Sequence, residues 1–480
     1  MDSYPQRETA VTAPVLCLFT TNLRLADHPA LDAAVRSGAP VIPLYVLDDE
    51  GPAAHRLGGA ARWWLHHSLN TLGKDLATRG SRLILRRGSL AATVAVVTRE
   101  TGATQVFFTR RYGPDALTTE ASLNAALTPL RATARRFGGQ LLWEPEAILT
   151  ATGTPYKVFT PFYNAAKARG AITTPLPAPA QLPAPPDWPR SDTLANWRLT
   201  PGTPNWAAGF SKIWQPGEAG AQAATEDFLS DAVGAYTTGR DMPGRRGTSR
   251  LSPHLHFGEI SPRSIWHRAH FAASAAPAKS RGTEAFLREI AWREFSHHLL
   301  HHFPTLPDSS FRPEFENLPW VEDAVALARW QRGQTGYPIV DAGMRELWAT
   351  GWMHNRVRMI VASFLVKDLM IHWRHGAAWF WDTLVDADLA ANSANWQWVA
   401  GSGADAAPYF RVFNPVLQGR KFDPDGAYVR RWVPEITALP DRFIHAPWEA
   451  PDAPRAYPAP MIDHAKARVR ALAAFKSLSR

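Results

Sequence analysis

The stretch VLCLFT at Val15–Thr20 and its counterpart VIPLYVLD at Val41–Asp48 decide the fold of the amino-terminal part. Both are unbroken apolar runs, and stretches with helical spacing of apolar residues separate them from further runs of the same kind. Unbroken apolar strands that alternate with helices are typical of a parallel sheet covered on both faces. We therefore predict an α/β domain with a five-stranded, Rossmann-like parallel sheet. Its strands are expected at residues 15–20, 41–48, 82–87, 105–110 and 140–144.

The end of the first strand narrows the choice of ligand. Sheets of this type bind ligands at the carboxyl ends of their strands. The first strand continues as TTNLRL at Thr20–Leu25, which lacks the G-x-G-x-x-G pattern of a dinucleotide site. The sequence therefore does not support a nicotinamide cofactor here.

The rest of the chain follows a different pattern. Ten of the 40 prolines fall between Ala171 and Pro216, which indicates an extended surface connector. Beyond it the apolar spacing is helical throughout. We predict an α/β domain at 14–150, a proline-rich linker at 151–219 and an all-α domain at 220–480. Helices are expected at residues 221–236, 261–275, 283–303, 321–331, 339–349, 355–373, 377–384 and 464–480.

Composition limits the class of protein. The chain is 45% hydrophobic and 20% charged, which is too apolar for disorder, and its single cysteine, Cys17, cannot form an internal disulfide. It has no run of 18 apolar residues and no targeting peptide at its start, so we expect a cytoplasmic protein without membrane spans. The net charge of +9 suggests an anionic partner such as nucleic acid. Ten of the 20 tryptophans lie between Trp292 and Trp398, and this clustering requires an explanation.

Three short motifs could carry chemistry. The first, TSRLSP at Thr248–Pro253, places hydroxyls, backbone N–H groups and an arginine at a turn that enters a helix, as a phosphate site requires. An ordinary helix start, with Ser252 as the N-cap and Pro253 as the first helical residue, explains the same spacing.

The second motif, DADLAAN at Asp386–Asn392, places two carboxylates and an amide in an apolar stretch. Buried acids need partners, which Arg358 or Arg356 could supply, and a structural ion pair is the alternative interpretation. The histidines follow no metal-ligand pattern, so no metal is predicted.

The third motif is a helix face that carries Glu289, Trp292 and Arg293. An aromatic ring beside an acid and a base can stack on and hydrogen-bond to a flipped nucleobase. A surface ion pair between Glu289 and Arg293 is the alternative. Trp396 and Trp398 are two residues apart, so they cannot both pack on one core face.

Taken in order, these motifs resemble those of the DNA photolyase/cryptochrome family. The resemblance covers residues 14–450 and is carried by LRLADHPAL at 23–31 and by six blocks in the helical part. These blocks are TSRLSPHLHFGEISPR (248–263), EIAWREF (289–295), TGYPIVDAGMRELWATGWMHNRVRM (335–359), ASFLVKDL (362–369), DADLAANSANWQWVAG (386–401) and DAAPYFRVFNP (405–415).

The resemblance implies that the helical domain holds FAD in a U-shaped conformation. Asn392 matches the position that faces flavin N5, and Arg358 the partner of Asp386 beside the flavin ring. A folate or deazaflavin antenna chromophore is possible, but no motif here identifies its pocket. The residues implied in FAD binding are Tyr236, Thr248, Ser249, Arg250, Leu251, Ser252, Arg358, Asp386, Ala387, Asp388 and Asn392.

The resemblance also assigns roles to five tryptophans. Trp396, Trp373 and Trp320 match an electron-transfer triad that leads from the flavin to the surface, and Trp292 and Trp398 match the walls of a lesion pocket. Glu289 matches a catalytic residue that hydrogen-bonds to the damaged bases. The residues implied in contacts with damaged DNA are Arg240, Glu289, Trp292, Arg293, Asn355, Arg356, Met359, Trp398 and Gln418.

The implied activity is that of a deoxyribodipyrimidine photo-lyase, a carbon–carbon lyase acting on UV-damaged DNA of the nucleoid. Excited FADH⁻ gives an electron to a flipped-out cyclobutane pyrimidine dimer, the ring splits and the electron returns. Asn355 and Met359 occupy the two positions where photolyases for the (6-4) photoproduct carry histidines, which favours cyclobutane dimers. A cryptochrome-like blue-light receptor without repair activity is the alternative, and an unrelated flavoprotein is a third possibility. We expect a monomer.

Overall fold

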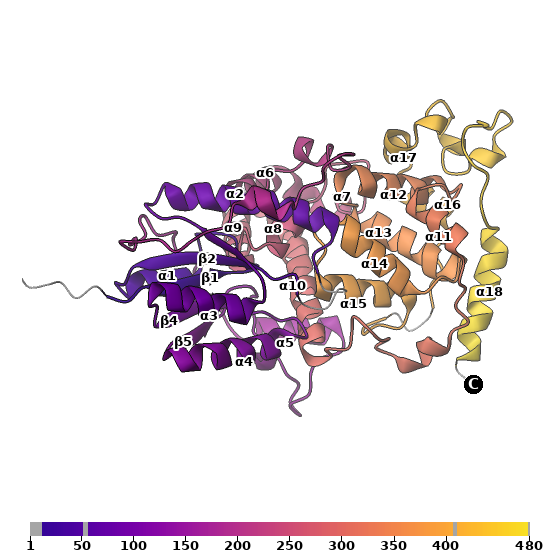
Figure 1. Ribbon diagram of the computed structural model, residues 1–480. Coiled ribbons are helices and arrows are strands. Elements are labelled where there is room, and N and C mark those ends of the chain that lie inside the picture. Colours follow the sequence, from indigo (N-terminus) through magenta and orange to yellow (C-terminus); the bar gives the residue numbers. More distant parts are fainter. Residues whose placement is uncertain (1–11, 51–55, 407–409, 479–480) are drawn as a thin grey trace, which may run out of the picture.

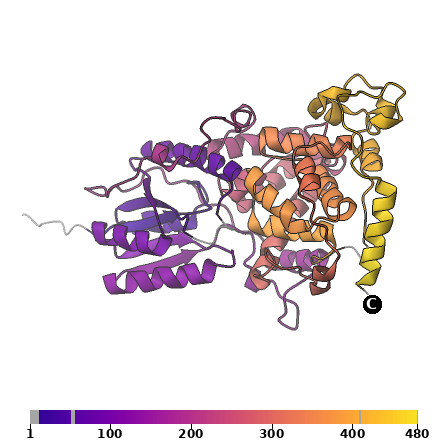
Figure 2. The same ribbon diagram turned by 45° about the vertical axis from the view of Figure 1, so that its right-hand side comes forward.

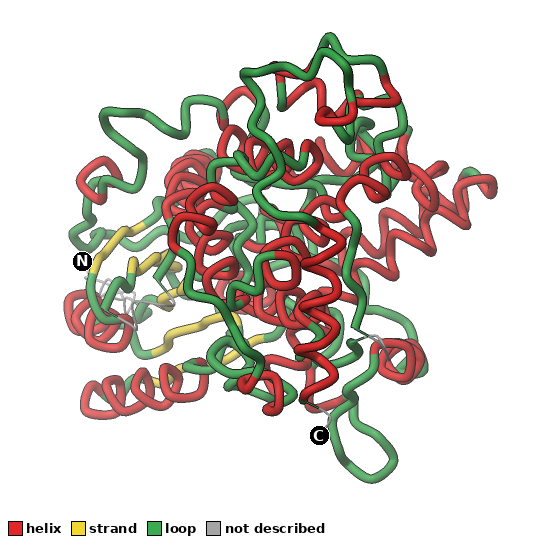
Figure 3. Tube along the Cα trace, turned by 90° about the vertical axis from the view of Figure 1, so that its right-hand side faces the viewer, coloured by secondary structure: helices red, strands yellow, loops and turns green. Residues whose placement is uncertain are grey.

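The computed structural model describes residues 12–50, 56–406 and 410–478. Figure 1 shows a sheet with flanking helices in the amino-terminal part and a larger group of helices in the carboxyl-terminal part. The turned view in Figure 2 also shows the two groups side by side, and the tube in Figure 3 shows the strands gathered together at one side of the view. The predicted fold class, an α/β domain followed by a helical domain, is confirmed.

The amino-terminal sheet has the order β3-β2-β1-β4-β5, and every neighbouring pair is parallel. Its strands are β1 (Val15–Phe19), β2 (Val41–Leu47), β3 (Ile84–Arg87), β4 (Gln105–Thr109) and β5 (Thr133–Phe137). The helices of this domain are α1 (Pro29–Arg36), α2 (Gly59–Ala77), α3 (Leu90–Thr101) and α4 (Ala116–Leu127).

Both faces of the sheet are buried because successive side chains of a strand point to opposite sides. Cys17 and Phe19 of β1 pack in one core with residues of α1 and α2. Leu16 and Leu18 pack in a second core with residues of α3 and α4. The unbroken apolar run of β1 is therefore explained by a strand that is covered on both faces.

The predicted fifth strand is wrong. β5 lies at Thr133–Phe137, and the residues expected to form it, 140–144, form no strand. β5 is an edge strand that pairs only with β4 and leaves most of its side chains in solvent, so it lacks the apolar run that marked the others. The apolar Leu142 and Trp143 instead pack against the helical domain, where their backbone N–H groups donate to buried Glu294 at 2.6 and 3.4 Å.

The helical part follows the predicted spacing in most of the expected ranges, but it contains further helices and one predicted helix is interrupted. Its helices are α5 (Phe159–Lys167), α6 (Glu218–Ser230), α7 (Tyr236–Gly239), α8 (Ser252–His256), α9 (Pro262–Ala275), α10 (Ser280–His302), α11 (Ala324–Gln331), α12 (Pro338–Thr350), α13 (Asn355–Ser363), α14 (Trp373–Thr383), α15 (Leu389–Ala400), α16 (Pro415–Phe422), α17 (Ala427–Trp432) and α18 (His464–Ser477). The sequence did not predict α5, α7, α15, α16 or α17. The helix predicted at 355–373 is interrupted. Its α-helical part ends at Ser363, a π-helical segment follows at 364–368, and His372 then caps the start of α14.

The proline-rich segment runs along the sheet domain after α5. Its backbone bonds to the sheet where Val41 donates to the Pro183 carbonyl at 2.7 Å and Asp192 donates to the Leu85 carbonyl at 2.8 Å. Leu85 belongs to edge strand β3, so this segment covers one open edge of the sheet.

The two domains share buried contacts. Trp352 and Val385 of the helical part belong to the same core as β1. The guanidinium of Arg24 is buried between the domains and donates to the Gly258 carbonyl at 2.8 Å. Asp27, fully buried, pairs with Arg263 at 2.5 Å. These contacts fix the sheet domain against the helices that carry the candidate site.

Candidate active site

An ion pair joins helix α13 to the turn that precedes α15 in the helical domain. Nη2 of Arg358, on α13, donates to both carboxylate oxygens of Asp386 at 3.1 and 2.8 Å. Nε of the same arginine donates to the Met353 carbonyl at 2.8 Å, which fixes the guanidinium. The Asp386 side chain is only 3% exposed. The residue pattern alone left open whether Arg358 or Arg356 would pair with this acid, the family resemblance implied Arg358, and the structure contains the pair with Arg358.

Asp388 begins the helix that carries Asn392. Its Oδ1 accepts the N–H of Ala391 at 2.8 Å as the N-cap of α15, and its Oδ2 lies 3.5 Å from His297 Nε2 and 3.7 Å from His256 Nδ1. Burial alone would raise the pKa of this carboxyl, but His297 and His256, together with the charge of Arg293, outweigh burial and hold it well below its usual range. Asn392 is half-buried one turn further on and donates to the Ala377 carbonyl at 3.0 Å.

The turn at Thr248–Ser252 carries a cation without a carboxylate partner. Thr248, Ser249 and Arg250 are half-buried, and Arg250 has a φ of +53°, while Leu251 is buried. The Arg250 guanidinium lies 5.0 Å from the Trp352 ring centroid, and no carboxylate of the described residues pairs with it. Burial lowers its pKa, because the site disfavours an uncompensated positive charge.

The start of α8 differs slightly from the alternative interpretation of this motif. The helix begins at Ser252 itself, and Leu251 is the N-cap residue, which makes no side-chain cap. The Ser252 hydroxyl instead accepts the indole N–H of Trp352 at 3.3 Å. Tyr236 on α7 is buried nearby in the fold's helical core, edge-on to Phe286 at 5.7 Å.

These residues fit FAD. An uncompensated, partly buried arginine beside two hydroxyls suits a diphosphate, and hydroxyl and guanidinium donors are the groups that bind phosphate oxygens. His256 and His297 each leave both ring nitrogens buried without a hydrogen-bond partner among the described residues. Orphaned buried polar atoms of this kind are expected where a polar group completes the site. The helical domain thus offers an anion site and a buried polar lining, as the cofactor requires.

Two tryptophans lie on either side of a short loop. The Trp292 ring, on α10, stacks on Phe159 with centroids 3.7 Å apart and planes 6° apart. The Phe159 N–H donates to the Asp405 carboxylate at 3.3 Å, and the Trp398 indole N–H donates to the Asp405 carbonyl at 3.1 Å. Asp405 therefore fixes both tryptophans in relation to one another. Both indoles are half-buried, so each keeps an accessible surface.

Arg240 and Asp241 bridge this site to two helices. Arg240 pairs with Glu289 of α10 at 2.5 Å, and Asp241 pairs with Arg356 of α13 at 2.7 Å. Nη1 of Arg356 lies 3.7 Å from the Met359 sulfur. The structure therefore gathers these residues from three separate segments into one ion-paired cluster.

Three further predicted DNA contacts have different surroundings. Asn355 is exposed at the start of α13. Gln418 lies on α16, the helix that supplies the Phe422 ring beneath the Arg356 guanidinium at 4.4 Å. Arg293 is not placed with them: its side chain is 14% exposed and donates to Glu294 at 2.9 Å and to the Gln140 carbonyl at 3.2 Å. Buried Glu294 holds the Arg293 guanidinium, and a phosphate contact by Arg293 stays a prediction.

The three tryptophans of the predicted triad run outward from the core. Trp396 and Trp373 are 3% and 1% exposed, and Trp320 is half-buried at the edge of the same cluster. His372 lies between the outer pair, with its ring centroid 4.8 Å from Trp320 and 5.6 Å from Trp373. All three indole N–H groups are buried without an acceptor among the described residues.

Sequence reasoning missed the residues that position the site. Asp405 and Phe159 hold the two tryptophans, Asp241 holds Arg356, and His256 and His297 face Asp388. Asp405 lies in the quoted block DAAPYFRVFNP, and His256 and His297 lie within or next to quoted blocks. Only Asp241, one residue after Arg240, had a signal in spacing, because neighbouring opposite charges can bridge two helices.

The described part of the chain contains neither a helix suited to span a membrane nor a cluster of side chains suited to bind a metal ion. None of its helices is both long enough and apolar enough to span a membrane. Within the same ranges, 12–50, 56–406 and 410–478, no group of three or more histidine, cysteine or acidic side chains is arranged to hold a metal ion.

Fold and site together define the class of this protein as a two-domain FAD-binding protein. Two family models match the chain, the DNA photolyase model over residues 15–183 and the FAD binding domain of DNA photolyase over residues 286–477. The chain belongs to the DNA photolyase family. The predicted family and the predicted FAD cofactor are thereby confirmed.

The similar proteins include photo-lyases and cryptochromes. A deoxyribodipyrimidine photo-lyase of Agrobacterium fabrum is 49% identical over 98% of this chain and 99% of its own. Cryptochrome-1 of Arabidopsis thaliana is 36% identical over 94% of this chain but only 69% of its own length. Among solved structures, a class III photolyase from Agrobacterium tumefaciens superposes with a TM-score of 0.95 at 49% identity, over 99% of this chain and 100% of that chain.

Proposed function

We propose that this protein is a deoxyribodipyrimidine photo-lyase that uses light to split cyclobutane pyrimidine dimers in DNA. The observation that carries the proposal is the pair of half-buried indoles, Trp292 and Trp398, held by Asp405 next to the acid Glu289. Indole faces stack on flipped bases, and a carboxylate one helical turn from Trp292 can accept their N–H groups. The high identity to photo-lyases supports the same activity.

The chain's own residues bind and position the damaged strand. Arg240, Arg356 and Gln418 contact phosphates around the opening, and these contacts set the register of the DNA. The dimer is already poorly stacked and paired, so flipping it between the two tryptophans costs little. Bound FAD supplies the light-driven one-electron reduction that opens the ring. Asn392 would hydrogen-bond to the bound cofactor, and the pair of Arg358 and Asp386 would hold helix α13 against the turn before α15 beside it.

The substrate is a cyclobutane dimer because the lesion site offers no histidine for proton transfer. His354 is the nearest candidate, but its Nδ1 caps α13 by accepting the Arg356 N–H at 3.2 Å. Burial lowers the pKa of His354 to about 4, so it is neutral at physiological pH. Repair of a (6-4) photoproduct requires a proton-donating group in this position, and opening a cyclobutane ring does not.

Repair of dimer-containing DNA under blue light tests this function. We expect the reduced protein to restore intact pyrimidines, and to leave them dimerised in the dark. A protein that signals as a cryptochrome, or an unrelated flavoprotein, would leave the dimers intact in the light. A gel-shift titration separates these two alternatives, since the unrelated flavoprotein has no preference for irradiated DNA. The monomeric state and the cytoplasmic location stay predictions.

Replacing Glu289 with alanine is expected to lower repair about tenfold or more while FAD stays bound. The change removes a charge-assisted hydrogen-bond acceptor worth about 1.5–3 kcal/mol, and each 1.4 kcal/mol is tenfold. Flavin absorbance and repair quantum yield are measured together. Glu284→Ala is the matched control, because Glu284 is an exposed acid on the same helix. Loss of flavin from the Glu289→Ala protein would contradict the assignment.

Replacing Asp241 with asparagine is expected to tighten binding to undamaged duplex DNA. The carboxylate holds Arg356 at 2.7 Å and repels phosphates, so its neutralisation strengthens the phosphate contact of Arg356 and raises the positive charge that faces the DNA by one. The slope of log affinity against log salt should steepen by about one unit. Asp32→Asn, which removes an acid from an exposed ion pair on α1, serves as the control. A salt slope identical to that of the wild type would show that Arg356 makes no phosphate contact.

A further inference from the structure

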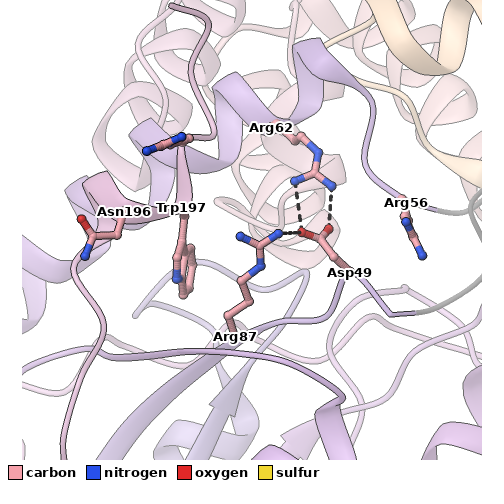
Figure 4. A pocket seen from close by; sticks show the side chains of 7 residues that line it. Asp49, Arg56, Arg62, Arg87, Asn196 and Trp197 are labelled. Carbon is pink, nitrogen blue, oxygen red and sulfur yellow. Dashed lines mark hydrogen bonds and ion pairs between the residues drawn. The ribbon is translucent and has the colours of Figure 1, made fainter.

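A basic pocket lies beside the sheet, away from the site described above. Its volume is about 550 Å³, which is within the range of small-molecule sites. Figure 4 shows arginines from separate segments around it. Its lining residues are Asp49, Arg56, Arg62, Arg87, Asn196, Trp197 and Arg198. None of them is part of the proposed flavin or lesion site.

The pocket lies at the edge of the sheet where ligands are expected. Asp49 follows the last residue of β2 by two positions, and Arg87 is the last residue of β3, so both stand at carboxyl ends of parallel strands. The switch point of this sheet, between β1 and β4, is filled instead. The cavity there, lined by Thr20 and Thr109 among others, measures about 20 Å³, which is room for about one water molecule.

One carboxylate arranges two of the guanidinium groups. Asp49 accepts from Arg62 at 2.5 and 3.3 Å and from Arg87 at 3.1 Å. Arg62 is also fixed by its Nε, which donates to the Leu57 carbonyl at 2.9 Å. Figure 4 shows both guanidinium groups converging on Asp49. Arg87 uses only one of its five N–H donors in this pair, so most of its donors remain available to a ligand.

Arg198 adds a charge from the proline-rich segment. Its backbone has a φ of +49°, and the preceding Trp197 is buried, with its indole N–H donated to Asp192 at 3.2 Å. Trp197 therefore anchors the turn that presents Arg198. The Arg198 side chain is exposed, and no carboxylate in the described part of the chain pairs with it. Arg62, Arg87 and Arg198 of the lining thus face the single carboxylate of Asp49.

We propose that this pocket binds a small molecule with two or more linked phosphate groups. Arginine forks match phosphate geometry and bind it through paired N–H donors. A single phosphate would leave the excess of positive charge partly uncompensated, whereas a diphosphate or longer chain can reach guanidinium groups on both sides of Asp49. The indole N–H of Trp197 is already used and its ring is buried, so the lining favours the charged part of the ligand rather than a stacked base.

Calorimetric titration of the flavin-loaded protein with inorganic pyrophosphate tests the proposal. We expect a dissociation constant below about 1 mM, and a loss of about tenfold or more in affinity for Arg87→Ala and for Arg198→Ala, since each removes charge-assisted hydrogen bonds. Arg198→Ala removes no internal contact, so it reports on binding even if Arg87→Ala disturbs the fold. Arg99→Ala is the matched control, because Arg99 is an exposed arginine of the same domain on α3.

Two outcomes would overturn the proposal. One is an absence of pyrophosphate binding to the wild-type protein, or an affinity for pyrophosphate in both pocket variants that equals that of the wild type. The other appears in a parallel titration with undamaged duplex DNA: if the pocket variants weaken DNA binding and leave pyrophosphate binding unchanged, the arginines contact the DNA backbone instead. Unchanged dimer repair in Arg198→Ala is expected in either case, so failure here is distinguishable from failure of the proposed function.

Discussion

Light-driven reduction of bound FAD is expected to be lost when Trp320 is replaced by phenylalanine, while repair by protein reduced chemically beforehand is retained. An indole is far easier to oxidise than a phenyl ring, so the substitution removes an electron donor and keeps an aromatic side chain. Trp320 is the outermost of the three tryptophans, and it is half-buried at the margin of the core. Its loss therefore leaves Trp396 and Trp373 in place.

The position of Trp320 explains why the effect should be large. Trp373 and Trp396 are enclosed in the core, so an external reductant cannot reach either indole directly. Trp320 is the member of the three with access to the surface, and it contacts Trp373 through the ring of His372. Without it, an oxidised Trp373 has no outer partner, so the electron returns from the flavin before an external reductant can act.

The measurement is the bleaching of oxidised flavin absorbance under blue light with an external thiol as reductant. Trp432→Phe is the matched control, because Trp432 is a partly buried tryptophan that packs on the same core and is not a member of the triad. Photoreduction of the Trp320→Phe protein at the wild-type rate would show that electrons reach the flavin by another route. Loss of repair by the pre-reduced variant would mean that the substitution damaged the site itself.

The sequence predicted the four strands that are paired on both sides or carry apolar runs, and it failed at the fifth. Strand prediction from apolar runs depends on burial, and β5 is an edge strand whose side chains are mostly exposed. The residues predicted in its place, Leu142 and Trp143, are apolar because they pack against the helical domain. An apolar run alone does not show which partner buries it.

Some contacts of the candidate site could be predicted from the sequence and others could not. Arg358 and Asp386 could be paired from the sequence because the resemblance linked two motifs 28 residues apart, and the structure contains this pair. The contacts of Asp405 could not be predicted, since Phe159 lies 246 residues away and a backbone N–H makes the contact. Arg293 shares a helix face with Glu289, but side-chain direction depends on Glu294, whose burial in the interdomain contact draws the guanidinium inward. Helical spacing predicts faces, and it does not predict which polar group a side chain chooses.

Replacing Arg358 with methionine is expected to release FAD and to destabilise the protein by about 3–5 kcal/mol, the cost of leaving a buried charge without its partner. Asp386 is 3% exposed, and both its oxygens accept from Arg358. The measurements are flavin content after gel filtration and the free energy of unfolding in denaturant. Arg345→Met is the matched control, because Arg345 forms a similar pair with Glu435 at 2.8 Å in which both side chains are over 20% exposed. Its carboxylate keeps access to water when the arginine is removed, unlike that of Asp386, so this control should keep its flavin and most of its stability.

The double variant Arg358→Met with Asp386→Leu separates a structural ion pair from a cofactor site. Removing both charges abolishes the buried unpaired carboxylate, so most of the lost stability should return, and a double-mutant cycle measures the recovered part. Flavin content should not return, because the polar groups proposed to hold the cofactor are gone. If the double variant regained both stability and FAD, the pair would be an internal ion pair and nothing more. If stability returns and FAD does not, the two residues are assigned to cofactor binding. The packing of the domain would then be restored, and only the groups that bind FAD would be missing.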